Sequence, residues 1–130
     1  NEQGCSFAAN GYARTSGKLG VYFTTSGPGA VNALGGLVDA WFDGIPLMGI
    51  CGNVPTNEMK GFSGIRQNGF QEMDIVSMTR HITKYSVTPN NGEDFPEIIS
   101  RAYNMALLGR QGGVLIDFPF NIQKTSIIGR

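Results

Sequence analysis

Residues 26–29, Ser-Gly-Pro-Gly, are the part of this sequence whose types and spacing best suit contact with a ligand. They follow an apolar β-branched and aromatic run at residues 21–25, typical of a buried parallel strand, and they precede a helical pattern. Glycines at such a junction let the backbone approach a ligand and turn its N–H groups towards it. A plain tight turn has the same composition. The run is not G-x-G-x-x-G, because Asn32 stands where the third glycine would be.

Few other side chains suggest chemistry by themselves. Glu2 begins a predicted helix, where a carboxylate commonly serves only the helix dipole. His81 has no Cys, Asp or Glu at ligand spacing, so we interpret it as structural or surface, and we predict no metal site. Cys5 and Cys51 are too far apart for a C-x-x-C motif and lie in apolar stretches, which favours buried free thiols in a reducing, cytoplasmic setting.

Composition describes one globular domain's worth of chain. The 130 residues carry no formal net charge and are 41% hydrophobic, enough to bury a core. Because there is no basic run and no apolar run long enough to span a bilayer, we expect neither a nucleic-acid nor a membrane partner. The sequence begins without methionine, directly at a predicted helix, as a fragment would.

Hydrophobic periodicity predicts alternating helices and strands. The predicted helices cover residues 2–14, 29–42, 71–79 and 94–108, the strands residues 21–25, 47–51, 82–87 and 114–118, and a long glycine-rich loop residues 52–69. This alternation predicts an α/β three-layer sandwich, with a mainly parallel sheet flanked by helices on both faces. Gly35 and Gly36 weaken the second helix and therefore predict a neighbour packed very close to it.

A series of short motifs recurs in a fixed order along nearly the whole chain. They are Glu2-Gln3-Gly4, Gly11-Tyr12-Ala13-Arg14, Thr25-Ser26-Gly27-Pro28-Gly29-Ala30, Asn32, Asp39-Ala40, Ile45-Pro46-Leu47, Val54-Pro55, Phe70-Gln71-Glu72, Ile82-Thr83-Lys84 and Ile116-Asp117-Phe118-Pro119. In this order the series resembles the N-terminal pyrimidine-binding (PYR) domain of thiamine-diphosphate enzymes, specifically the acetolactate synthase (acetohydroxyacid synthase) large-subunit group.

This resemblance implies roles for particular residues. Glu2 would be catalytic, sharing a proton with N1′ of the cofactor's aminopyrimidine, in an apolar pocket that should raise the carboxyl pKa. Gln71 would be a second catalytic residue, with Phe70 and Lys84 also on the substrate side; a solvated lysine on a strand edge is the alternative for Lys84. The implied cofactor-binding residues are Glu2, Ser26, Gly27, Pro28, Gly29 and Asn32.

The resemblance also implies what the full-length enzyme does. It would decarboxylate a 2-keto acid and ligate the product to a second carbonyl, as in branched-chain amino acid biosynthesis, using thiamine diphosphate, Mg²⁺ and, as a possible addition, FAD. The active site would lie between this domain and the pyrophosphate-binding (PP) domain of a second subunit in a homodimer or homotetramer. Metal and diphosphate would bind that PP domain through a Gly-Asp-Gly segment and a later Asn.

On this basis residues 1–130 would be a single, partial PYR domain, N-terminally truncated before its first strand–helix–strand unit. Residues 119–130 would be a tail leading to a middle domain. Because this sequence has no Gly-Asp-Gly segment, we expect the chain alone to be inactive and to hold the cofactor weakly.

Two departures from the family pattern leave the substrate open. Asn1 replaces the histidine that precedes the glutamate in most acetolactate synthases, and the connection from Pro55 to Phe70 is longer than theirs. Some family relatives in surface-polysaccharide gene clusters carry a similar Arg-Gln-x-Gly-Phe-Gln-Glu run, so an unusual keto-acid or sugar-linked substrate is a hypothesis. The alternatives in other classes are a nucleotide- or NAD-binding Rossmann-type module and a non-catalytic interaction domain with the same fold.

Overall fold

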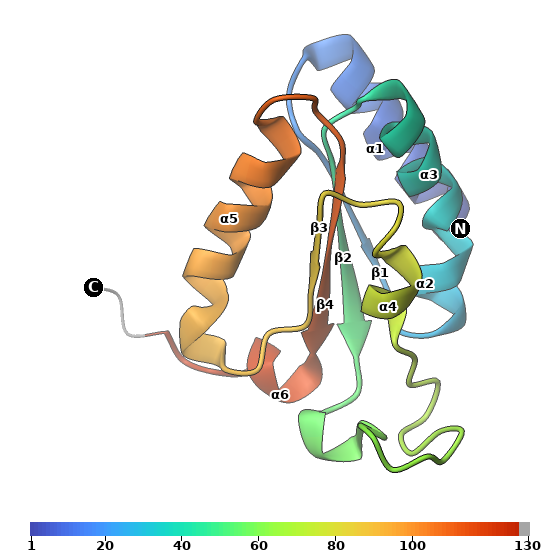
Figure 1. The fold of residues 1–130 in the computed structure, drawn as a ribbon, viewed down its shortest axis with the longest axis vertical. Helices are drawn as coiled ribbons and strands as arrows, with labels where there is room; N and C mark the ends of the chain where they lie inside the picture. The colour runs from blue at the N-terminus through green and yellow to red at the C-terminus, as the bar shows by residue number, and fades with distance from the viewer. Residues whose placement is uncertain (128–130) are drawn as a thin grey trace.

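The computed structural model describes residues 1–127 and is built on a four-stranded sheet (Figure 1). Its strands are β1 (Gly20–Thr24), β2 (Leu47–Asn53), β3 (Tyr85–Val87) and β4 (Gly113–Pro119). They lie in the order β1-β2-β4-β3, and every neighbouring pair is parallel. The expected α/β class with helices flanking a parallel sheet is confirmed.

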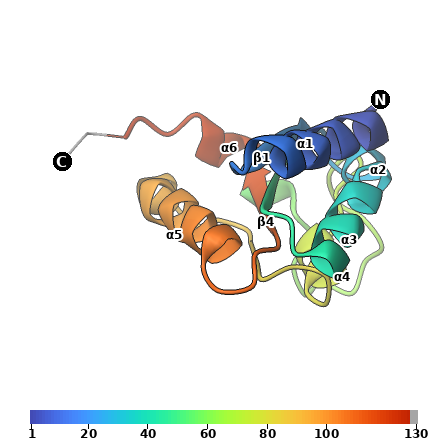
Figure 2. The same cartoon turned by 90° about the horizontal axis from the view of Figure 1, so that it is seen from above.

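Helices cover the two faces of this sheet unequally. One face carries α1 (Glu2–Ser16), α2 (Pro28–Asn32), α3 (Leu34–Asp43) and the short α4 (Ile75–Thr79), whereas α5 (Phe95–Leu107) lies on the other (Figures 1 and 2). The first core joins Leu37, Leu47 and Leu115, and the second packs Ala102 and Ala106 of α5 onto apolar side chains of β2 and β4. A last helix, α6 (Phe120–Gln123), lies in the expected 119–130 tail, whose last three residues fall outside the described part.

The connections reverse direction in the middle of the sheet. The chain moves from β1 to β2 through α3 on one face, and from β3 back to β4 through α5 on the other. The reversal point therefore lies between β2 and β4. In open parallel sheets, ligands bind beyond the carboxyl ends of the strands at such a point.

The predicted elements exist, but several boundaries were wrong. The helix expected at residues 29–42 is two helices, because Ala33 adopts φ −82° and ψ −7° and its N–H is shared between two carbonyl oxygens, those of Gly29 and Ala30. The apolar periodicity continues through this one-residue break, so a pattern cannot reveal it. The strand expected at residues 82–87 is shortened to β3.

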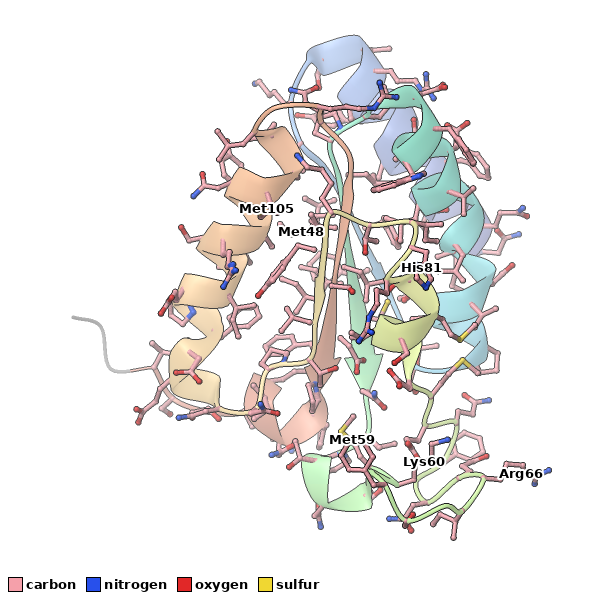
Figure 3. The ribbon with its side chains drawn as sticks, in the orientation of Figure 1. Met48, Met59, Lys60, Arg66, His81 and Met105 are labelled. Carbon is pink, nitrogen blue, oxygen red and sulfur yellow. The ribbon has the colours of Figure 1, made fainter. Side chains whose placement is uncertain are left out.

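The helix expected at residues 71–79 begins only at Ile75. Asp74 caps it, its side chain accepting a hydrogen bond from the Ser77 N–H at 3.0 Å. Before it, a 3-10 turn (Thr56–Glu58) is followed by irregular chain, so the predicted loop runs on through Met73. Figure 3 shows this loop, with Lys60 and Arg66, beyond the carboxyl ends of the strands.

Helices flank both faces of the sheet, but the expected burial of the first strand was wrong for one side of β1. Its Val21 and Phe23 are exposed on the α5 face, next to an open apolar groove of about 690 Å³ that shares no residue with the region around Glu2. The expected burial of both thiols also held for only one of them. Cys51 is buried, which raises its pKa to about 11, whereas Cys5 is exposed.

Candidate active site

Glu2 lies beside the glycine-proline turn, although thirty residues separate it from Asn32. Its Oε2 accepts a hydrogen bond from Asn32 Nδ2 at 2.9 Å. Its Oε1 lies 3.4 Å from the place that a Cβ on Gly29 would occupy. The first turn of α1 is capped by Asn1, whose Oδ1 accepts from the Gly4 N–H at 2.8 Å. The fold therefore places this carboxylate beside both ends of α2, next to Gly29 in its first turn and Asn32 at its last residue.

The expected rise of the Glu2 pKa was wrong for the chain by itself. The pKa of Glu2 is lowered, chiefly because the Asn32 amide donates to the charged form. The carboxylate lies at the surface, so little desolvation opposes this hydrogen bond. A group that covers the carboxylate would oppose this effect and raise the pKa of Glu2.

Contacts between α1 and α3 fix the helix that carries Glu2. A Cβ on Gly36 would lie 2.6 Å from Ser6 Oγ, so the expected close neighbour of the helix glycines is α1. Arg14 Nη2 bonds Asp39 at 2.7 Å and Asp43 at 2.6 Å across the two helices. This half-exposed pair of ion pairs sets the register of α1 more than it stabilises the fold.

Gly27 and Gln71 press against each other at the same turn. Gly27 has φ 57° and ψ −119°, a conformation open essentially to glycine alone. A Cβ here would lie 2.4 Å from the Gln71 carbonyl oxygen. Gly29 is similarly confined, since its Cβ would lie 2.6 Å from Thr25 Cγ2. Both glycines are required by contacts within the chain, so the turn is more specific than a plain corner.

Phe70 and Gln71 are the central residues of a β-turn that the Glu72 N–H closes on the Gly69 carbonyl at 3.3 Å. Gln71 is the only non-glycine residue with positive φ, 57°, in the described part of the chain, at a turn position that favours glycine. A side chain kept at a strained position is a pointer to function. Phe70 is 79% exposed beside it.

The remaining predicted site residues divide into two groups. Ser26 is half-buried and Pro28 is exposed as the first residue of α2, both within the turn. Lys84 is not brought to this site: it precedes β3 at the opposite edge of the sheet, where its N–H and Nζ donate to Gly113 and Leu108 carbonyls. His81 is exposed beyond α4 (Figure 3).

Across residues 1–127, no three His, Cys, Asp or Glu side chains gather as metal ligands, and no helix is long and apolar enough to cross a membrane.

Residues 1–78, which include Glu2, the glycine-proline turn and the Phe70–Gln71 turn, match the family model "Thiamine pyrophosphate enzyme, N-terminal TPP binding domain". The chain belongs to this family. This TPP-binding domain is 48% identical over 124 residues to an acetolactate synthase from Arabidopsis thaliana, covering 95% of this chain and 18% of that protein. It is 41% identical over 127 residues to an acetolactate synthase from Arthrospira platensis, covering 98% and 21%. The chain thus spans about a fifth of the length of these relatives. The membership sets aside the NAD-binding alternative.

A buried polar group in the TPP-binding domain was missed from the sequence. Asp117 of β4 is 2% exposed, and its Oδ2 accepts hydrogen bonds from Asn53 Nδ2 at 2.8 Å and Thr88 Oγ1 at 3.0 Å. Its Oδ1 has no hydrogen-bond partner among the described residues. The group lies at the reversal point between β2 and β4. The signal was available, because a carboxylate inside the apolar run 114–118 needs partners.

Asp117 should make the stability of the protein depend on pH. Burial raises its pKa from 3.8 to about 6, aided by the charge of Asp74 and opposed by the Asn53 and Thr88 hydrogen bonds. The folded state thus holds the proton more tightly than the unfolded chain does. Stability is then full below about pH 4 and falls, by up to about 3 kcal/mol, as the pH rises through 6. Urea unfolding at several pH values should show this fall, and Asp117→Asn should remove it; equal slopes in both proteins would contradict the assignment.

Proposed function

We propose that this chain is the PYR part of a thiamine-diphosphate-dependent enzyme that decarboxylates a 2-keto acid and ligates the product to a second carbonyl, as acetolactate synthases do. One observation carries the proposal. The Glu2 carboxylate, bonded to Asn32, lies against Gly29 at the end of the turn that Gln71 also contacts.

The residues present fit the aminopyrimidine of thiamine diphosphate. The Asn32 amide donates to Glu2 Oε2 and so orients the carboxyl group. Oε1, on the Gly29 side, would then be free to exchange a proton with the ring nitrogen. A ring over Glu2 would also exclude water and raise the carboxyl pKa towards the range needed for proton transfer. When bound, thiamine diphosphate supplies a thiazolium that stabilises the carbanion left by loss of carbon dioxide.

The other residues of the site shape the space around the reaction. The backbone at residues 26–29 would lie against the cofactor, because Gly27 and Gly29 project no side chain there. Phe70 and Gln71 would face the substrate from the strained turn. We assign no substrate contact to Lys84, since its place at the opposite sheet edge speaks against the implied role.

The rest of the active site is proposed to come from outside this chain. Mg²⁺ and the diphosphate would bind a PP domain of a second subunit, in a homodimer or homotetramer, and FAD would be an optional further cofactor. The relatives are about five times as long as this chain, which leaves ample room for such a domain. The chain alone should then bind thiamine diphosphate with a Kd above the micromolar range. A micromolar or lower Kd in calorimetry would contradict the proposal that the PP domain supplies most of the cofactor binding.

The proposed reaction is tested with the full-length protein that carries this chain. Purified protein is given pyruvate and other 2-keto acids, with and without thiamine diphosphate and Mg²⁺, and carbon dioxide and ligated product are measured. Turnover that requires thiamine diphosphate is the expected result. Rapid acetolactate formation from pyruvate alone would count against an unusual substrate. No cofactor-dependent turnover with any keto acid would favour the non-catalytic interaction domain.

Replacing Gln71 should separate stability from activity. Gln71→Gly relieves a left-handed conformation that costs a side chain about 1–2 kcal/mol, against about 0.5–1 kcal/mol of added chain entropy in the unfolded state. We expect the glycine variant to be as stable as the parent or slightly more so, and more stable than Gln71→Ala by about 1 kcal/mol. Both variants should lose keto-acid turnover. Equal unfolding midpoints for the two variants would refute the strain.

A further inference from the structure

We propose that Asp117 is a positioning residue for the Phe70–Gln71 turn and acts on it through Asn53 and Val54. The consequence for catalysis depends on the function proposed above; the mechanical coupling does not. Asp117 lies inside β4 and is nearly completely buried. Its Oδ2 accepts hydrogen bonds from Asn53, at the end of β2, and from Thr88, directly after β3. A carboxylate so placed holds the carboxyl ends of β2, β3 and β4 together.

The first step of the coupling is the orientation of the Asn53 amide. An ionised carboxylate only accepts hydrogen bonds, so it draws the Nδ2 end of Asn53 towards itself. The Oδ1 end then faces the other way and accepts the Val54 N–H at 2.8 Å. Asp117 thereby fixes the direction in which the chain leaves β2.

The second step is the contact between the two ends of the loop. Val54 packs against Gly69 so closely that a Cβ on Gly69 would lie 2.9 Å from both Val54 methyl groups. The Gly69 carbonyl accepts the N–H of Glu72, and this bond closes the turn whose central residues are Phe70 and Gln71. A displaced Val54 would therefore displace the acceptor that closes the turn.

The third step reaches the cofactor side. Gln71 meets Gly27 through its carbonyl oxygen and Cβ, within the space that a side chain on Gly27 would fill. Since the positive φ of Gln71 is unfavourable by itself, the surrounding contacts must hold it. Asp117 helps to hold Gln71 in this conformation only indirectly, through Asn53, Val54 and Gly69.

The experiment compares four variants of the full-length protein. Asp117→Ala removes the acceptor, whereas Asp117→Asn keeps a carbonyl oxygen that can accept both hydrogen bonds. Asn53→Ala and Thr88→Val form a matched pair, because each removes one neutral donor to the same carboxylate oxygen but only Asn53 continues to Val54. The pair also decides the question if Asp117→Ala does not fold.

Amide hydrogen exchange of residues 67–74 is the main readout, with kcat and KM for the keto acid beside it. Asp117→Ala and Asn53→Ala should speed exchange at Glu72 about tenfold or more, while Asp117→Asn and Thr88→Val should stay within about threefold of the parent. The first two variants should also lose kcat or gain KM at temperatures where they are fully folded.

Equal exchange at Glu72 in Asn53→Ala and Thr88→Val would overturn the proposal. So would a rise spread evenly over the whole protein, because that is what a merely structural carboxylate would give. If exchange responds as expected but the parent shows no thiamine-diphosphate-dependent turnover, the positioning of the turn stands and the proposed function fails.

Discussion

Glu2→Gln in the full-length protein should lower kcat for 2-keto acid turnover by about 10²–10⁴-fold, the usual contribution of a positioned acid–base group. The amide has nearly the shape of the carboxyl group and can still bond to Asn32, but it cannot exchange a proton with a ring nitrogen. Steady-state turnover with saturating thiamine diphosphate measures the effect. Because Glu2 lies at the surface, the variant should remain folded.

Glu97→Gln is a matched control for this experiment. Glu97 also lies in the first turn of a helix, α5, and is exposed on the opposite face of the sheet. Both substitutions remove one favourable charge from a helix N-terminus, a loss of about 0.3–1 kcal/mol in each case. Only Glu2→Gln should remove activity. A Glu2→Gln protein with activity within about threefold of the parent would end the assignment of the carboxyl group to proton transfer.

Gly27→Ala should destabilise the protein by about 4 kcal/mol, the sum of about 1–3 kcal/mol for the backbone conformation and a similar amount for overpacking. The new Cβ would lie 2.4 Å from the Gln71 carbonyl oxygen, and backbone cannot move aside as a flexible side chain can. Chemical unfolding with a linear extrapolation gives the difference.

Gly61→Ala is a control for the positive φ of Gly27. Gly61 has nearly the same φ, 53°, but nothing lies within 4 Å of where its Cβ would be. It should therefore cost only about 1–2 kcal/mol, the penalty for a side chain at positive φ. If the two variants lose the same free energy of unfolding, the contact between Gly27 and Gln71 is not what confines the glycine.

Local patterns were enough to predict the class of fold. The largely apolar runs at residues 47–51 and 114–118 are typical of strands buried on both faces. Glycines at 17 and 44 end helices with the left-handed cap that glycine adopts most readily. The residue types around the turn, together with Glu2 and Gln71, carried the resemblance to thiamine-diphosphate enzymes. Sequence alone therefore determined the architecture, the family and most of the residues to test.

Only the tertiary structure decided which of those residues share a site. Lys84 and Gln71 are both expected on the substrate side from the motif series, yet the structure separates them. Lys84 bonds Gly113 at the start of β4, whereas Gln71 packs against Gly27 beyond the end of β1, because the loop before α4 brings Gln71 to the glycine turn. Contacts between residues distant in sequence also explain why Asn32 lowers the pKa of Glu2 and why Asp117 is buried with Asn53 and Thr88. Hydrophobic periodicity predicts which face of a helix or strand a residue occupies, but not which distant side chain it contacts. Those contacts decide the pKa and the hydrogen bonding of a residue such as Glu2 or Asp117.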